Sequence, residues 1–185
     1  MKIKVGVSNR HVHLKQEDLE NLFGKDYKLN VLFELTQPGM FAAVEKVTLK
    51  GPKGIIDGVR IVGPIRAYTQ IEVSRSDAKI LGVNPPIRDS GDLEGSAPIM
   101  IIGPKGTVRK KEGCIIAARH IHTNFEDGID YNSWDIVKLG FDDKVMSNVM
   151  IKKNSNFVLE LHIDKDDAKK FNLKNKDIID FEIGE

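Results

Sequence analysis

The sequence predicts a mainly β protein with a few short helices, organised as two similar halves. Short β-rich segments separated by tight-turn residues are typical of small barrels or sandwiches. Residues 47–64 and 97–117 share the order strand, GPKG turn, strand. The tetrapeptides RHVH at 10–13 and RHIH at 119–122 also repeat, differing only between Val12 and Ile121. Both repeats indicate that each half contains the same β-rich unit.

Runs of β-branched and other apolar residues, bounded by Gly, Pro, Asn or Asp, predict the strands. The candidate strands are residues 3–8, 31–35, 44–50, 56–62, 68–74, 98–102, 114–119, 145–151, 157–163 and 178–183. Apolar residues at helical spacing predict short helices in segments 15–24, 77–83, 135–141 and 167–173. Residues 85–98 are rich in Gly, Pro, Asp and Ser and predict a loop.

The composition is that of an ordinary soluble globular protein, with 41% apolar and 30% charged residues. Lys plus Arg number 28 and Asp plus Glu 27, so no basic surplus indicates a nucleic-acid partner. No apolar run approaches the length needed to span a membrane. The single cysteine, Cys114, excludes an internal disulfide and suits a reducing compartment. The chain opens on a strand pattern without a signal region or targeting helix, so we expect a cytoplasmic protein.

All five histidines fall in three short segments, RHVH, RHIH and ELH. In an extended strand, side chains at i and i+2 point to the same face. Each HxH therefore presents two imidazoles side by side, which can grip a divalent metal ion together. Two matching copies that use almost the whole histidine complement favour metal binding over a structural role.

A second repeat places an aspartate five residues after a residue able to bind metal, where a strand ends and a helix begins. It occurs as His13 with Asp18, Glu72 with Asp77, His162 with Asp167 and His122 with Asp127. This alignment makes Glu72 a candidate ligand rather than an exposed strand carboxylate. In the copy after His122 the pattern is interrupted, which predicts an insertion at 127–134 before a helix at 135–141.

The segment HVHLKQE also fits the HxH-x3-E motif of cupins, which are iron or manganese enzymes built on a jelly roll. A cupin glutamate continues along a strand, whereas Glu17 falls in a segment with helical periodicity. The second cupin element, a Gly-rich turn leading to a histidine, is missing from the sequence. The cupin interpretation is therefore the weaker alternative.

Five segments occur in an order that closely resembles the PduL-type phosphotransacylases, or phosphate propanoyltransferases. They are SNRHVHL, GPIRAYTQIEVSRSDA, RDSGDLEGSAP, AARHIHT and LELHI, and the resemblance extends from Val5 to about Phe181. It implies two small packed β-barrels with a two-metal site between them. The first barrel would be residues 11–114, and the second would be residues 115–185, completed by an N-terminal strand at 1–10. The implied reaction is zinc-dependent acyl transfer between coenzyme A and phosphate, with acetyl or propanoyl as the acyl group.

The resemblance also assigns site residues. One zinc would be held by His11, His13 and Glu72, and the other by His120, His122 and His162. Arg66 in GPIR matches the family's phosphate-binding arginine, and Ser90 in RDSGD lies in the loop beside it. The implied partners are acyl-CoA, CoA, phosphate and acyl phosphate, with no nucleic acid or membrane. A homo-oligomer is left open, and the CoA-binding residues cannot be assigned.

The chemistry suits these residue types. Zinc stabilises a thiolate leaving group, and three protein ligands per ion leave open coordination positions. The guanidinium of Arg66 can hold phosphate oxygens in a fork, although a surface ion pair is the alternative. Arg10 and Arg119 precede the two HxH motifs and are expected to act behind the ligands or in ion pairs of the barrels. A zinc thioesterase and a structural zinc module remain as alternative functions.

Overall fold

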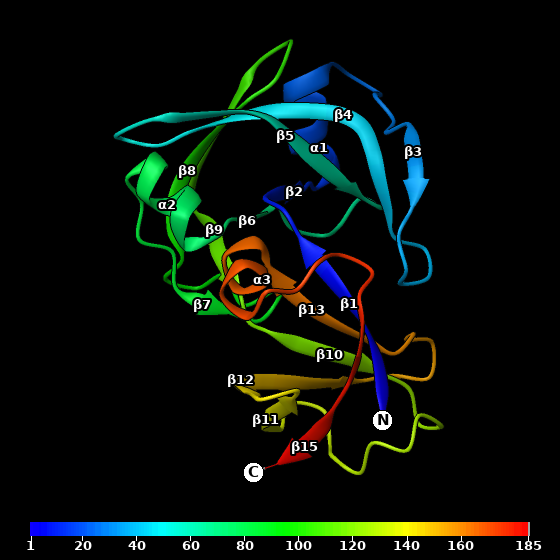
Figure 1. Cartoon of the computed structure of the whole chain (residues 1–185). Helices are drawn as coiled ribbons and strands as arrows, with labels where there is room; N and C mark the ends of the chain where they lie inside the picture. The colour runs from blue at the N-terminus through cyan, green and yellow to red at the C-terminus, as the bar shows by residue number, and fades with distance from the viewer. Residues whose placement is uncertain (185) are drawn as a thin grey trace. The chain divides into compact units, whose positions relative to one another are not determined.

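A computed structural model of the chain describes residues 1–184, and it is mainly β, with 47% of residues in strands and three short helices in this range. The strands are β1 (Lys2–Ser8), β2 (His11–His13), β3 (Val31–Glu34), β4 (Phe41–Lys50), β5 (Ile55–Gly63), β6 (Gln70–Glu72), β7 (Ile87–Arg88), β8 (Ala97–Ile102), β9 (Thr107–Ala117), β10 (His120–Thr123), β11 (Ile136–Phe141), β12 (Lys144–Lys153), β13 (Glu160–Asp164), β14 (Ile178–Asp180) and β15 (Glu182–Gly184). The helices are α1 (Gln16–Phe23), α2 (Arg75–Leu81) and α3 (Lys165–Phe171). The predicted fold class is confirmed (Figure 1).

The chain divides into two compact units. The first unit comprises Asn9–Leu35 and Gly39–Ala117. The second unit comprises Met1–Ser8, Thr36–Pro38 and the chain from Ala118 onward. The domain boundaries expected from the sequence, at 11–114 and 115–185 with strand 1–10, stay a prediction.

The first unit is a closed six-stranded barrel. Its strands pair in the order β4, β5, β2, β6, β9 and β8, and β8 pairs again with β4 to complete the circle. The short strands β3 and β7 extend this sheet at β4 and β9. The barrel encloses an aliphatic core that includes Val12, Leu49, Ile61, Ile71 and Ile101. Alternate residues of each strand point into this core, as expected for a small barrel.

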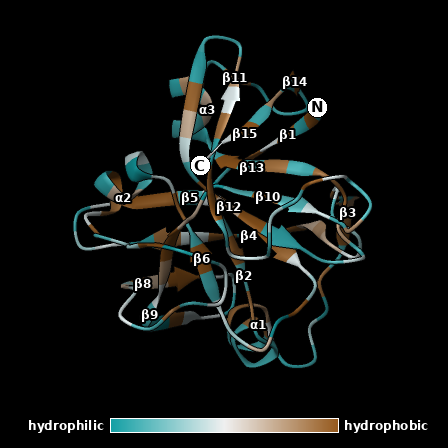
Figure 2. Ribbon diagram, turned by 90° about the horizontal axis from the view of Figure 1, so that it is seen from below, coloured by the Kyte–Doolittle hydropathy of each residue, from teal (hydrophilic) through white to brown (hydrophobic). Residues whose placement is uncertain are grey.

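The second unit is a nearly closed sheet with the order β14, β1, β13, β10, β12, β11 and β15. The N-terminal strand β1 lies parallel to β13, with Gly6 opposite His162. Its core includes Val5, Ile121, Leu139, Ile151 and Leu161. Figure 2 shows that many strands carry both apolar and polar residues, as expected where one face of a sheet is buried.

The internal repeat holds at the level of strand pairing. The HxH strand β2 lies parallel to β5 and antiparallel to β6, and the HxH strand β10 lies parallel to β12 and antiparallel to β13. Each antiparallel partner is followed directly by a helix, α2 after β6 and α3 after β13. The neighbour on the far side is also equivalent, because β9 lies parallel to β6 as β1 lies parallel to β13.

The helix predicted at 135–141 is wrong, because residues Ile136–Phe141 form strand β11. Their burial alternates along the chain, and β11 forms a hairpin with β12. The β-branched residues Ile136 and Val137 favour this strand once a hairpin partner is available. Asp127 accepts hydrogen bonds from the Thr123 hydroxyl (2.9 Å) and the Asn124 amide (2.7 Å), so it closes a turn instead of starting a helix.

Other boundaries differ by a few residues. The segment predicted as a loop at 85–98 includes the two-residue strand β7 and the start of β8. The strand expected at 178–183 is divided into β14 and β15 around Phe181. The remaining predicted strands and the helices near residues 16, 75 and 165 are found in the structure.

Both GPKG turns have a second role beyond closing their hairpins, because each one caps the end of a helix. The amide of Lys53 donates to the carbonyl of Leu81 at 3.0 Å, and the amide of Lys105 donates to the carbonyl of Leu22 at 2.9 Å. These are carbonyls of the last turns of α2 and α1, which have no partner within the helix. The turn glycines allow the two backbones to approach this closely.

Cys114 is fully buried in the core of the first unit, where burial raises the pKa of its thiol to about 12. A thiol that stays protonated and inaccessible is a small core side chain and not a nucleophile. Among the described helices, none has the length and apolarity needed to cross a membrane.

Replacing Gly51 by Ala should destabilise the protein. The new Cβ would lie 2.1 Å from the carbonyl oxygen of Leu81, so the turn must move away from α2. Overpacking of this kind costs about 1–3 kcal/mol, which chemical denaturation can measure. Gly140→Ala is the matched control, because its Cβ would meet no atom nearer than the Glu182 carbonyl oxygen at 3.9 Å. Equal stability losses in both variants would contradict the capping role of the turn.

Candidate active site

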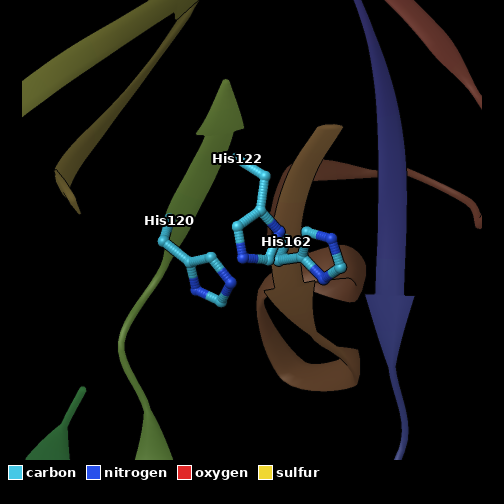
Figure 3. Close-up of side chains that lie close together, drawn as sticks. All are labelled: His120, His122 and His162. Atoms are coloured by element: carbon cyan, nitrogen blue, oxygen red, sulfur yellow. The ribbon is translucent and has the colours of Figure 1, made fainter. Parts of the chain in front are cut away.

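Three histidines of the second unit form a compact cluster. His120 and His122 lie on the same face of β10, and His162 comes from the antiparallel neighbour β13, directly opposite His120. Figure 3 shows the three imidazoles turned toward one another. The ring centroid of His162 lies 4.9 Å from that of His120 and 4.6 Å from that of His122. One ring nitrogen from each residue lies within 4.8 Å of the other two, so the three can ligate one metal ion.

The hydrogen bonds of this cluster leave ring nitrogens available. The Nδ1 of His120 bonds to the carbonyl of Ala118 at 2.8 Å, so this nitrogen carries the proton and Nε2 can act as a ligand. His122 Nδ1 is buried and has no hydrogen-bond partner within residues 1–184, whereas the buried Nε2 of His162 faces the Glu160 carboxylate. A bound cation would satisfy buried nitrogens of this kind, which otherwise carry a desolvation cost.

Burial keeps His120 and His122 neutral. It lowers the pKa of His120 well below the ordinary value and that of His122 to about 3. The positive charge of Lys152 lowers the pKa of both residues further. Since a metal binds only the unprotonated imidazole, both histidines are in the ligand form at pH 7.

Glu160 supports this cluster and was not predicted from the sequence. It lies on β13 two residues before His162, opposite His122, and is almost fully buried. Its Oε2 is 2.7 Å from His162 Nε2, and its carboxylate also faces Lys4 at 3.8 Å. Gly6 on the neighbouring strand leaves room for it, because a Cβ there would lie 3.0 Å from the Glu160 carboxyl carbon. The i−2 spacing from a predicted ligand was the only sequence signal.

The first unit holds the second cluster, made of His11 and His13 on β2 and Glu72 on β6. His11 lies directly opposite Glu72 in the antiparallel pair. The Nε2 atoms of both histidines lie 3.4 Å from the Glu72 carboxylate and 3.1 Å from each other. Their Nδ1 atoms bond to backbone carbonyls, His11 to Asn9 at 2.8 Å and His13 to Val62 at 3.1 Å. The carbonyls therefore fix the tautomers and aim both Nε2 lone pairs at a common point.

The charges in this cluster are set by burial and by Glu72. Burial lowers the pKa of His13 to about 4. Burial also lowers the pKa of His11, but the charge and hydrogen bond of Glu72 outweigh it, so the net pKa is raised. Burial would raise the pKa of Glu72, yet the two histidines hold it well below its usual range. The cluster thus combines an ionised carboxylate with two imidazoles.

Arg66 and Ser90 meet beside the first cluster. Arg66 Nη1 donates to Ser90 Oγ at 2.9 Å, and the Arg66 amide is anchored to the Leu14 carbonyl at 2.9 Å. Gln70 links this pair to the cluster, because its Nε2 donates to Glu72 at 2.7 Å and to Ser90 at 3.0 Å. Burial and Glu72 have the larger effects on the pKa of His11, and the charge of Arg66 lowers it. The first unit therefore brings together all five of its predicted site residues.

The two arginines that precede the HxH motifs form ion pairs, as one of the two expectations had it. Arg10 donates to Asp77 at 3.0 Å, and Arg119 makes a bidentate pair with Asp167 at 2.6 and 2.7 Å. Both aspartates lie in the first turn of the helix that follows the third ligand of the same cluster. Each pair connects the start of an HxH strand to that helix and so helps to fix the position of the histidines relative to the third residue of the cluster.

Two further residues near the clusters were missed by sequence reasoning. Gln70 is fully buried two residues before Glu72 and opposite His13. Lys152 lies opposite His122 in the parallel pair of β10 and β12. Neither residue belongs to a ligand pattern, and only strand register shows that they face a histidine.

The cupin motif is not assembled. Glu17 lies in the first turn of α1, is exposed, and pairs with Lys15 instead of the histidines. The carboxylate that completes the cluster is Glu72, from another strand. The cupin interpretation is therefore wrong for this chain.

The family is established by comparison with known proteins. A family model described as phosphate propanoyltransferase matches residues 4–174. A protein named phosphate propanoyltransferase from Thermotoga maritima is 50% identical to this chain, over 96% of this chain and 87% of its own length. Another of the same name from Rhodobacter capsulatus is 46% identical, over 96% of this chain and 85% of its own length. One from Salmonella typhimurium is 40% identical over 90% of this chain and 81% of its own. The chain belongs to the phosphate propanoyltransferase family and is an enzyme of the acyltransferase class.

Proposed function

We propose that this enzyme interconverts acyl-CoA and phosphate with acyl phosphate and free CoA, with acetyl or propanoyl as the acyl group. The observation that carries this proposal is the first unit, where a buried His–His–Glu cluster adjoins the Arg66–Ser90 pair. Relatives named phosphate propanoyltransferase support it. A cytoplasmic location and a homo-oligomer stay predictions.

The reaction joins a phosphate oxygen to the acyl carbon and breaks the bond between that carbon and sulfur. The proton of hydrogen phosphate passes to the CoA sulfur, so atoms and charge balance. Phosphate is already ionised at pH 7, so the protein needs no strong base to activate it. Its main tasks are to orient the phosphate and to stabilise the departing thiolate.

Zinc is the metal that best suits the two clusters, with one ion in each. The ligand sets are His11, His13 and Glu72 in the first unit, and His120, His122 and His162 in the second. Imidazole nitrogen and carboxylate oxygen are zinc ligands, and three of them leave a position open. When bound, zinc would stabilise the negative charge that develops on the CoA sulfur. Cobalt and iron accept the same ligands, and elemental analysis of the purified protein distinguishes the three metals.

Arg66 and Ser90 would bind the phosphate. The guanidinium carries five N–H donors in a fixed fork and matches phosphate oxygens in geometry and charge. Ser90 Oγ accepts a hydrogen bond from one of these N–H groups, which leaves the other N–H groups of Arg66 to bind phosphate. No histidine is hydrogen-bonded to Ser90 in the described structure, so the hydroxyl lacks the base that a serine nucleophile requires.

Metal content provides the first test. The wild-type protein, stripped of metal and titrated with zinc, should bind two ions per chain. His13→Ala and His122→Ala should each lose one tight site, because each removes a ligand from a different cluster. Glu17→Ala is the control and should keep both, since Glu17 lies outside the clusters. Loss of a site in Glu17→Ala, or no loss in either histidine variant, would contradict the assignment.

Phosphate dependence provides the test of the reaction. Purified protein should release thiol from acetyl-CoA and propanoyl-CoA only when inorganic phosphate is present, because phosphate is the acyl acceptor. The product should appear as acyl phosphate in equal amount to the thiol. Equal release without phosphate would identify a thioesterase, and no release under either condition would leave the structural zinc interpretation.

Arg66→Ala should raise the KM for phosphate by about tenfold to a hundredfold, since it removes a charge-assisted pair of hydrogen bonds to the anion. The KM for acyl-CoA should change by less than about threefold, and the metal content should be unchanged. Arg109→Ala, at an exposed position of β9, is the matched control. A KM for phosphate that is the same in all three proteins would remove Arg66 from the phosphate site.

A further inference from the structure

The side chain of Gln70 is fully buried and lies between Glu72 of the first cluster and Ser90. It lies on β6 two residues before Glu72, so the two side chains share a face of the strand. Its Nε2 donates to Glu72 Oε1 at 2.7 Å and to Ser90 Oγ at 3.0 Å. Its Oε1 accepts from the amide of Gly91 at 2.8 Å. All of the polar atoms of this side chain are therefore engaged.

The orientation of the amide follows from its partners. An ionised carboxylate can only accept hydrogen bonds, and a backbone N–H can only donate. The NH2 group must then face Glu72, and the carbonyl oxygen must face Gly91. A flipped amide would oppose two oxygens on one side and two donors on the other.

Ser90 is held in one hydrogen-bonding role as a result. Its Oγ accepts hydrogen bonds from Nη1 of Arg66 at 2.9 Å and from Nε2 of Gln70 at 3.0 Å, and both of these nitrogen groups can only donate. Two accepted hydrogen bonds occupy both lone pairs of the hydroxyl. The Ser90 proton is thereby directed at neither neighbour and is available to a bound anion.

We propose that Gln70 is a positioning residue that couples the metal ligand Glu72 to the phosphate-binding pair Arg66 and Ser90. One amide group fixes the carboxylate by a donated hydrogen bond and, with the second donated bond, holds Ser90 as a donor. The loop that carries Ser90 is fixed at the same time through Gly91. The phosphate half of this coupling rests on the function proposed above, whereas the Glu72 half concerns metal binding alone.

The second unit supports this assignment by its complementary chemistry. Glu160 occupies the equivalent register, opposite His122 as Gln70 is opposite His13. The ligand two residues later is an imidazole in one case and a carboxylate in the other. An imidazole nitrogen needs an acceptor beside it, and Glu160 supplies one, while Glu72 needs a donor, and Gln70 supplies one. The residue at this position thus matches the ligand that it supports.

The test uses Gln70→Met, which keeps the volume of the side chain and removes all three hydrogen bonds. Two readouts are independent: zinc binding to the metal-free protein at the first cluster, followed in the His122→Ala background, and the KM for inorganic phosphate. The zinc affinity of the first cluster should fall by about tenfold, and the KM for phosphate should rise by about tenfold, as expected for lost hydrogen bonds to charged groups. Gln16→Met, on the exposed face of α1, is the matched control and should change neither.

A double-mutant cycle distinguishes coupling from general loosening. Ser90→Ala and Gln70→Met should raise the KM for phosphate by less in combination than the product of their single effects, because they disrupt the same link. Multiplying effects, or a loss of thermal stability with an unchanged KM and zinc affinity, would overturn the proposal. If wild-type activity needs no phosphate, the proposed function fails, and the zinc readout alone decides the role of Gln70.

Gln70→Glu covers the case in which Gln70→Met does not fold. It keeps the size of the side chain and an acceptor for Gly91, and in its ionised form it cannot donate a hydrogen bond. Ser90 would then donate to the new carboxylate, so the KM for phosphate should again rise by about tenfold. An unchanged KM in a folded Gln70→Glu variant would overturn the coupling to Ser90.

Discussion

The candidate site depends on antiparallel register between an HxH strand and its neighbour. Alternation along one strand places two imidazoles on one face, but only the paired strand can bring the third candidate ligand to them. In the first unit His11 is opposite Glu72, and in the second His120 is opposite His162. A shift of one residue in either pair would turn the third ligand to the other face of the sheet. The closed barrel and the nearly closed sheet resist such a shift because each HxH strand is paired on both sides.

Backbone carbonyls complete what register begins. His11, His13 and His120 each use Nδ1 to bond to a carbonyl oxygen, which leaves Nε2 for a metal ion. The carbonyls belong to Asn9 and Ala118, each two residues before its histidine, and to Val62 at the end of β5. The Asn9 contact of His11 and the Ala118 contact of His120 are equivalent, so the internal repeat includes the tautomer of these two histidines as well as the strand order.

Much of this arrangement was readable from the sequence, and the failures have physical causes. The strands, the GPKG hairpins and the candidate ligands follow local patterns, so periodicity and turn chemistry predict them. Residues 135–141 have an apolar pattern that suits a helix, and they form β11 because a hairpin partner follows at once. Gln70, Glu160 and Lys152 could not be predicted in the same way, because each gains its meaning only from the residue opposite. Local propensity carries no information on such pairs.

Gln70 and Glu160, each two residues before the third residue of a cluster, show how these small units accommodate buried polar groups. Gln70 and Glu160 are each almost fully buried, and a buried polar side chain is costly unless its hydrogen bonds are made. At this position the amide and the carboxylate are not interchangeable. A carboxylate at position 70 would face Glu72, and an amide at 160 would remove the negative charge that faces Lys4. Each choice is therefore fixed by the charge of its neighbours, and the difference between the two clusters extends beyond the ligands to the residues that hold them.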